Sequence, residues 1–249
     1  MIRPKTTLFI LTSLDGRITG NFSKALPTKY SSKIFQQIGF EHALTEDYNF
    51  QGWIYGSNTS TSYFAKGTPV INEDVPLVTA GDYISPVAHD VHYIALDRKG
   101  QLNWKSNTTS YEGHPAGVIE VLTDQASNGY KHFLRERHIS YLMAGHQNID
   151  LPLLLTKLVE IYHMSNILLG GGGILNWSFL SAGLCDEVAM LVTPAIDGLA
   201  DTARLFNSQF AGDPHPIGFT LKECRVLKES NLWLRYTPNN VSARDQAAG

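Results

Sequence analysis

The chain has 249 residues, a formal net charge of -3 and 43% hydrophobic residues, a composition typical of a globular protein. Its 20 Lys and Arg are outnumbered by 23 Asp and Glu and form no basic cluster, which argues against nucleic acid as a partner. No apolar run approaches the roughly 20 residues that span a bilayer, and the short apolar stretch near the N-terminus is unlike a signal peptide. We therefore expect a cytoplasmic protein without membrane contact.

No linker or internal repeat divides the chain. We expect a single domain over residues 1–238 and a polar, disordered tail over residues 239–249. The two cysteines lack CxxC spacing, and the nine histidines include no HxxxH or HExxH pair. No metal site is expected, and a zinc deaminase is excluded because it needs a PCxxC segment.

The first half of the chain alternates predicted strands and helices. In order, the pattern predicts a strand at residues 6–11, a helix at 31–38, a strand at 51–55, a helix opening near 57 and a strand at 91–96. The polar stretch 99–117 has no period and is expected to form a long surface loop. A strand at 118–123 follows it.

The second half continues the alternation. The pattern predicts a helix at residues 129–137, a strand at 140–144, a helix at 151–162 capped by Asp150, a strand at 166–169, a helix at 174–182 and a strand at 187–193. Two alternating runs at 221–227 and 231–236 are close enough to form a hairpin. Strands alternating with helices predict an α/β fold with a mostly parallel sheet, and the hairpin predicts an antiparallel edge.

Gly170, Gly171, Gly172 and Gly173 stand between a predicted strand and a predicted helix. Consecutive glycines lose much backbone entropy on ordering, so a chain keeps them where its backbone must approach something closely. Free N–H groups at a helix N-terminus bind phosphate without a basic side chain. The last glycine of the dinucleotide-binding fingerprint is missing, and no Gly-Lys-Ser or Gly-Lys-Thr follows, which excludes that fingerprint and a P-loop. We predict a phosphate site; the alternatives are a flexible turn or close packing of strand and helix.

Three other predicted strand ends carry polar residues. Asp15 follows the first strand in a loop that could cover a cofactor, or simply forms a turn. Gly56 and Thr59 stand where a strand passes into a helix, which suits phosphate oxygens or ordinary helix capping. Arg98 follows the third strand, where a guanidinium could hold the 2′-phosphate of NADP or lie in a solvated turn.

These segments, in this order, resemble one family. They are a strand followed by SLDGRI, a strand followed by a glycine and a threonine, a strand ending in Asp97 and Arg98, and ILLGGGGILNWSFLSAGLCDEVAMLVTPAIDG. The chain resembles the reductase domain of the riboflavin-pathway bifunctional deaminase-reductase, itself similar to dihydrofolate reductase. The resemblance implies a dihydrofolate-reductase-like three-layer α/β sandwich, with a mixed, mostly parallel sheet and a C-terminal antiparallel hairpin.

The resemblance also implies a homodimer that uses NADPH to deliver a hydride to C1 of the ribosyl group of a ribosylaminopyrimidine phosphate. The implied cofactor contacts are Thr12, Tyr30, Thr59, Arg98, Gly171, Gly172, Gly173, Ile174 and Leu175. Thr28 falls where the family has a serine that contacts the substrate. Asp15 is the nearest candidate for relaying a proton through water.

Three positions depart from the family pattern. Gly170 stands where the family has a glutamate near the substrate, Tyr63 stands where an aspartate is usual, and no arginine precedes the second strand. A site built to hydrogen bond its substrate discriminates strongly, so losing several such partners can change the substrate. The alternatives are the same fold and cofactor acting on another small carbonyl, imine or pterin compound, and a nucleotide-binding protein without catalysis.

Overall fold

The computed structural model describes residues 1–41, 43–208 and 215–241. The chain forms two compact units: a first unit of residues 1–4 and 51–165, and a second unit of residues 5–50 and 166–241, apart from the gaps just given. Whether residues 1–238 form the single domain that we expect depends on how the two units are arranged relative to each other. The single domain therefore stays a prediction. Of the tail expected at 239–249, residues 242–249 lie outside the described residues.

The second unit contains a five-stranded sheet among its described residues, in the order β7-β1-β8-β10-β9. The strands are β1 (Lys5–Thr12), β7 (Asn166–Gly171), β8 (Glu187–Val192), β9 (Phe219–Val226) and β10 (Leu232–Pro238). β1 lies between β7 and β8 and pairs in parallel with both. β10 pairs antiparallel with β8 and β9. The late runs therefore form the predicted hairpin at one edge.

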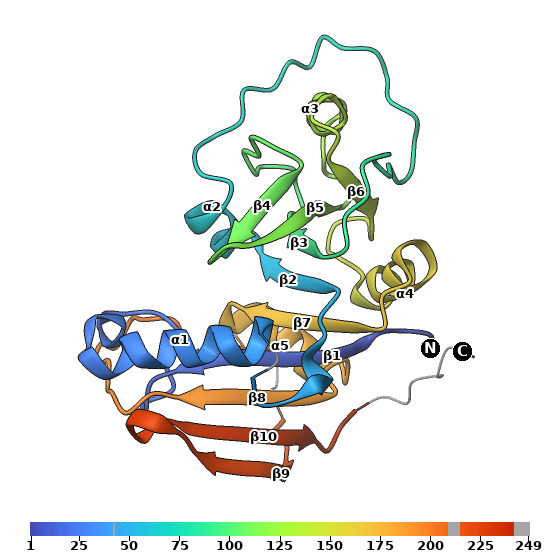
Figure 1. The fold of residues 1–249 in the computed structure, drawn as a ribbon. Coiled ribbons are helices and arrows are strands. Elements are labelled where there is room, and N and C mark those ends of the chain that lie inside the picture. The colour runs from blue at the N-terminus through green and yellow to red at the C-terminus, as the bar shows by residue number, and fades with distance from the viewer. Residues whose placement is uncertain (42, 209–214, 242–249) are drawn as a thin grey trace. The chain divides into compact units, whose positions relative to one another are not determined.

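The helices of the second unit cover its sheet. They are α1 (Leu26–Phe40) and α5 (Gly173–Ser181), with short 3₁₀ turns η1 (Asn21–Lys24), η2 (Glu46–Tyr48) and η3 (Lys228–Ser230). α1 packs against β1 and β8, and α5 packs against β7 (Figure 1). Successive strand residues point to opposite faces: Phe9 stacks on Phe35 of α1 with ring centroids 4.1 Å apart, whereas Ile10 faces Gly171, just before α5. The two helices therefore lie on opposite faces.

The first unit holds a second group of strands. They are β2 (Gly52–Gly56), β3 (His92–Leu96), β4 (Thr108–Tyr111), β5 (His114–Leu122) and β6 (Ser140–Met143). β2, β3, β5 and β6 are parallel, and β4 pairs antiparallel with the first residues of β5. Helix α2 (Ser57–Tyr63) packs on β2 and β3, α3 (Asn128–Glu136) packs on β6, and α4 (Leu151–Tyr162) precedes β7 (Figure 1).

The α/β class, the mostly parallel strands and the antiparallel hairpin are confirmed. The prediction that residues 99–117 form a loop holds for residues 99–107 but was wrong for residues 108–111 and 114–117, which belong to β4 and to the first part of β5. β4 is a short, largely exposed edge strand of sequence TTSY, so it lacks the apolar alternation that identifies a half-buried strand. Within the described ranges, no helix has the length and apolar character needed to cross a membrane.

A buried ionic network joins the hairpin to the rest of the second unit. Glu187 of β8 and Arg235 of β10 are almost fully buried and are linked by hydrogen bonds of 2.7 and 3.0 Å. Tyr48 donates to Glu187 at 2.5 Å and Lys222 donates to it at 2.9 Å. Burial opposes ionisation of Glu187, but the hydrogen bonds from Arg235, Lys222 and Tyr48 outweigh it and lower its pKa to about 2.

A second buried acidic group lies in the first unit. Glu120 of β5 is fully buried, and Asp97, which follows β3, is a second acid whose charge acts on it. Tyr130 of α3 places its hydroxyl 2.7 Å from Glu120 Oε1 and 2.8 Å from the carbonyl of Leu102. Burial and then the charge of Asp97 raise the pKa of Glu120 well above its usual value. Burial thus favours the protonated form of Glu120.

Replacing Arg235 tests the first network. Arg235→Met leaves Glu187 buried without its strongest partner, so we expect the free energy of unfolding in urea to fall by about 3 kcal/mol. Arg225→Met, on the neighbouring strand but half-exposed, is the matched control, with an expected loss of about 0.5 kcal/mol or less. Equal losses in the two variants would contradict a dominant role for the buried pair.

Replacing Glu120 tests the second network through pH. A carboxyl with a raised native pKa binds more protons in the folded state, so its contribution to stability is complete below the unfolded pKa near 4.5 and declines as pH rises toward the native value. As pH rises above the unfolded pKa, we expect the unfolding free energy of the wild type to fall by up to about 1.4 kcal/mol per pH unit from this residue, until the raised native pKa is reached, and Glu120→Gln to lack that fall. Parallel pH profiles from urea titrations would show that Glu120 ionises normally.

Candidate functional site

The glycine run of the second unit forms an open helix start. β7 continues through Gly171, so the predicted strand end at residue 169 was two residues short, and the turn is made at Gly172, with φ of 51°. α5 begins at Gly173 with no side-chain cap and no acidic residue in its first turn. The N–H groups of the first turn, including those of Ile174 and Leu175, have no acceptor within the helix. Such a start, with the helix dipole behind it, suits a phosphate.

Glycine is required here for backbone reasons. Gly171 and Gly172 have positive φ, which strains other residues. A Cβ at Gly173 would lie 2.3 Å from the carbonyl oxygen of Arg204, whereas one at Gly172 would meet open space. Close packing, the alternative reading of the run, therefore explains Gly173. The space beside Gly172 and the absence of a side-chain cap from the N-cap residue leave room for an anion at this helix start.

The end of β1 lies at the same edge of the sheet as this turn, because β1 and β7 are parallel neighbours. Thr12 is buried, and its hydroxyl donates to the carbonyls of Ser13 and Arg17 at 3.2 and 3.0 Å. These bonds hold the loop that follows β1. Thr12 is therefore placed at the predicted edge, with its hydroxyl directed to the loop backbone.

Asp15 fastens one loop to another. Its carboxylate accepts from Ser13 Oγ at 2.5 Å and from the backbone N–H groups of Asp197 and Gly198 at 3.1 and 3.2 Å. The Ser13 hydrogen bond, followed by that from Asp197, lowers the pKa of Asp15 to about 2. An ionised carboxylate with these partners is a poor proton donor at neutral pH, and its contacts explain its presence as a link between the loops after β1 and β8.

The two residues predicted on α1 differ in exposure. Thr28 is 2% exposed, and its hydroxyl donates to the carbonyl of Phe22 at 2.6 Å. The Ser31 hydroxyl contacts Thr193, which directly follows β8, at 2.8 Å and Asn231 at 2.6 Å. Thr28 Oγ1 lies 3.5 Å from Thr193 Oγ1, so Thr28 belongs to the same buried polar cluster. Tyr30, in contrast, is 48% exposed and free to contact a ligand.

In the first unit, Gly56 ends β2 and is the N-cap of α2, which also has no side-chain cap and no acidic residue in its first turn. Ser60, which the sequence did not single out, is fully buried, and its hydroxyl donates to the Gly56 carbonyl at 3.1 Å. Thr59 is half-buried on the same helix, and Tyr63 is exposed. The arrangement keeps the helix start fixed to the strand end.

Arg98 follows β3 at the same edge, because Gly56 and Leu96 are register partners. Its side chain is exposed, and its guanidinium donates to Asn148 Oδ1 at 2.8 Å. Its carbonyl accepts from the Thr123 N–H and hydroxyl at 3.2 and 2.7 Å. Arg98 is thus a cation on a turn whose backbone is fixed. Sequence reasoning missed Asn148, a polar residue in an unremarkable loop.

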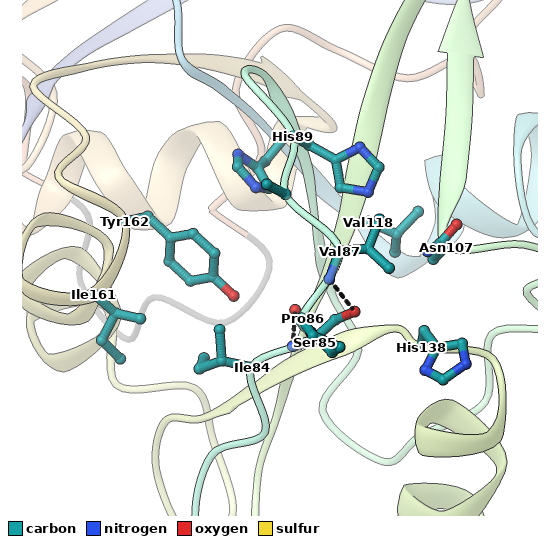
Figure 2. A pocket seen from close by; sticks show the side chains of 13 residues that line it. Ile84, Ser85, Pro86, Val87, His89, Asn107, Val118, His138, Ile161 and Tyr162 are labelled. Atoms are coloured by element: carbon teal, nitrogen blue, oxygen red, sulfur yellow. Dashed lines mark hydrogen bonds between the residues drawn. The ribbon is translucent and has the colours of Figure 1, made fainter.

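A cavity of about 300 Å³ lies elsewhere in the first unit. Figure 2 shows Ile84, Val87, His89 and Tyr162 among its lining side chains, and Ser85 accepts from Val87 N at 3.2 Å. The cavity includes His92 and Ser140, which begin β3 and β6. It therefore lies toward the amino ends of these strands, whereas Gly56 and Arg98 follow carboxyl ends. Ligands of open parallel sheets bind at carboxyl ends, so this cavity is not the predicted cofactor site.

Comparison with known proteins adds a family to this geometry. Residues 94–232 match the family model described as the RibD C-terminal domain. A curated relative, the 2,5-diamino-6-ribosylamino-4(3H)-pyrimidinone 5′-phosphate reductase of Methanothermobacter thermautotrophicus, is 37% identical over 105 residues, which are 42% of this chain and 47% of that protein. The match thus spans about half the length of the relative.

Solved structures share the fold at lower identity. A RibD protein of Acinetobacter baumannii superposes with a TM-score of 0.62 at 24% identity, over 95% of this chain and 58% of that one. A pyrimidine reductase-like protein of Corynebacterium diphtheriae gives a TM-score of 0.63 at 14% identity, over 97% of this chain and 93% of that one. The family model matches more than half of the length of this chain. This chain therefore belongs to the RibD C-terminal domain family.

Proposed function

We propose that this chain is an NADPH-dependent reductase. The observation that carries the proposal is the start of α5 at Gly172 and Gly173, where the N-cap residue supplies no side-chain cap and the first-turn N–H groups have no acceptor within the helix, in a chain of the RibD C-terminal domain family. A relative named as a reductase supports the same reaction class. We further propose that the protein is a cytoplasmic homodimer that acts on a small molecule.

The proposed cofactor contacts fall into two groups. In the second unit, Gly171, Gly172, Gly173, Ile174 and Leu175 would hold phosphate oxygens through backbone N–H groups, with Thr12 and Tyr30 beside the same sheet edge. In the first unit, Gly56 and Thr59 begin α2, and Arg98 would bind the 2′-phosphate that distinguishes NADPH from NADH. When bound, NADPH supplies the hydride, and the chain's part is to orient substrate and exclude water.

We propose a ribosylaminopyrimidine phosphate as the substrate, by analogy with the compound in the name of the curated relative, with hydride delivery to C1 of its ribosyl group. Two observations favour a second candidate, another small carbonyl, imine or pterin compound. Gly170 offers no side chain where a glutamate was expected, and the Thr28 hydroxyl is buried against the Phe22 carbonyl. Both remove polar contacts that would recognise a phosphorylated sugar.

The reaction is tested by following oxidation of NADPH with a panel of candidate substrates. We expect turnover with 2,5-diamino-6-ribosylamino-4(3H)-pyrimidinone 5′-phosphate or the corresponding aminouracil, and none with NADPH alone, because hydride transfer needs an acceptor carbon. Turnover with a dihydropterin alone would select the second substrate class. NADPH binding by calorimetry without turnover on any member would leave a nucleotide-binding protein without catalysis.

Arg98→Ala tests the cofactor assignment. Removing a charge-assisted contact to the 2′-phosphate should weaken NADPH binding by about 10- to 100-fold and leave NADH binding within about twofold, since NADH lacks that group. The measurement is the dissociation constant of each nucleotide by calorimetry. Lys99→Ala, at the adjacent exposed position of the same turn, is the control for a nonspecific charge effect. Equal losses for NADPH and NADH would remove Arg98 from this role.

A further inference from the structure

The turn that carries Arg98 is fixed from inside the first unit by four residues. Asp97, Gly100, Glu120 and Tyr130, here called the turn clamp, come from the end of β3, the turn itself, β5 and α3. Asp97, Glu120 and Tyr130 are each at most 2% exposed. None of the four is among the residues proposed above to contact cofactor or substrate. Burying a polar group costs free energy unless it is hydrogen bonded, so the contacts of these three side chains need to be identified.

Asp97 closes the turn. Its carboxylate accepts from the backbone N–H groups of Gly100 at 3.2 Å, of Leu102 at 2.8 Å, and of Gln101 between them. Arg98 lies inside this closed turn, and its own carbonyl is held by Thr123 at the end of β5. The path of the backbone at Arg98 therefore depends on where the Asp97 carboxylate is held.

Glu120 and Tyr130 hold Asp97 and the far side of the turn together. The Tyr130 hydroxyl lies 2.7 Å from Glu120 Oε1 and 2.8 Å from the Leu102 carbonyl oxygen. Asp97 is a second acid beside Glu120, and its charge acts on the Glu120 carboxyl. An ionised Glu120 would leave only the phenol proton to serve these oxygens, whereas a neutral Glu120 supplies a second proton. These groups are satisfied best by a neutral Glu120.

The ring of Tyr130 fixes the turn by packing as well. Gly100 has φ of 74°, and a Cβ there would lie 2.4 Å from the Tyr130 ring. The ring therefore lies directly on the turn backbone, and only glycine permits both the left-handed conformation and this approach. The turn is held by its hydrogen bonds to Asp97 and by contact with α3.

We propose that Glu120 is a positioning residue for the nicotinamide cofactor: through Asp97 and Tyr130 it sets the turn that presents Arg98 to the 2′-phosphate. This inference rests on the proposed function. Glu120 contacts no ligand; it acts through the turn, so it affects the preference for NADPH over NADH and leaves binding of the shared parts of the nucleotides unchanged. The titratable groups facing it are Asp97 and Tyr130, with the Trp104 indole as a further neighbour.

The test compares four variants by the ratio of NADPH to NADH dissociation constants, measured by calorimetry. Glu120→Met, close in size but unable to hydrogen bond to Asp97, should lower the preference for NADPH about tenfold, and Tyr130→Phe about threefold to tenfold. Glu120→Gln, which mimics the neutral acid, should keep the preference within about twofold. Tyr141→Phe is the matched control, because Tyr141 is buried, is the register partner of Glu120 on β6, and hydrogen bonds to Arg135.

A second measurement needs no cofactor. Hydrogen exchange of the Gln101 and Leu102 amides should accelerate in Glu120→Met and Tyr130→Phe, and stay at the wild-type rate in Glu120→Gln and Tyr141→Phe, because only the first two release the turn. Tyr130→Phe keeps the ring on Gly100, so it serves where Glu120→Met fails to fold.

The outcomes separate the inference from the proposed function. Loss of the NADPH preference in Arg98→Ala but not in Glu120→Met or Tyr130→Phe would overturn the positioning role alone, as would faster amide exchange with an unchanged preference. A wild-type chain that binds neither nucleotide, or binds both equally, would overturn the proposed cofactor selectivity and the positioning role with it. Loss of preference in Tyr141→Phe to the same extent would show a general effect of destabilising the first unit.

Discussion

Backbone N–H groups at the ends of strands need acceptors, and the way this chain supplies them separates its closed turns from its open ones. After β1, the Asp15 carboxylate accepts from the N–H groups of Asp197 and Gly198, and after β3 the Asp97 carboxylate accepts from three N–H groups of its own turn. After β2 and β7, helices begin at glycines with no side-chain cap. The carboxylates fix the two closed turns, whereas the two helix starts after β2 and β7 lack a side-chain cap, a feature that suits an anion.

An acidic residue that follows a strand can therefore serve to close a turn and need not be catalytic. Asp15 follows a strand and precedes a glycine, which is consistent with a catalytic loop or with a turn. Its partners are backbone N–H groups and a serine hydroxyl, and its pKa is lowered to about 2, so it serves the turn. Glu120 has the opposite character: burial and then the charge of Asp97 raise its pKa, which favours its protonated form. The two carboxyl groups differ because one accepts from N–H groups and the other lies against a second acid.

Sequence patterns predicted most of the fold because burial determines them. The β8 strand and the helix α4 follow their apolar periodicity, and the hairpin of β9 and β10 follows its alternation. β4 was missed since an exposed edge strand needs no apolar face. The glycine run identified the helix start, but only the structure explains Gly173 by the nearby Arg204 carbonyl. Asn148 and Tyr130 could not be found from sequence, because their importance arises from contacts between residues distant in the chain; Glu120 could have been noticed as a charge within an otherwise apolar strand.

The proposed cofactor contacts use two physical means with different tolerance to substitution. The proposed phosphate binding at α5 would rely on backbone N–H groups, which any residue except proline supplies, provided that the glycine conformations are kept. The proposed selection of the 2′-phosphate would rely on one side chain, Arg98, which is exposed and long and so has many conformations to lose on binding. A fixed backbone and the hydrogen bond to Asn148 reduce that loss before the ligand arrives. An exposed cation such as Arg98 has a defined position only if the turn that carries it is fixed. We propose that the buried acids Asp97 and Glu120 meet this requirement by fixing the turn.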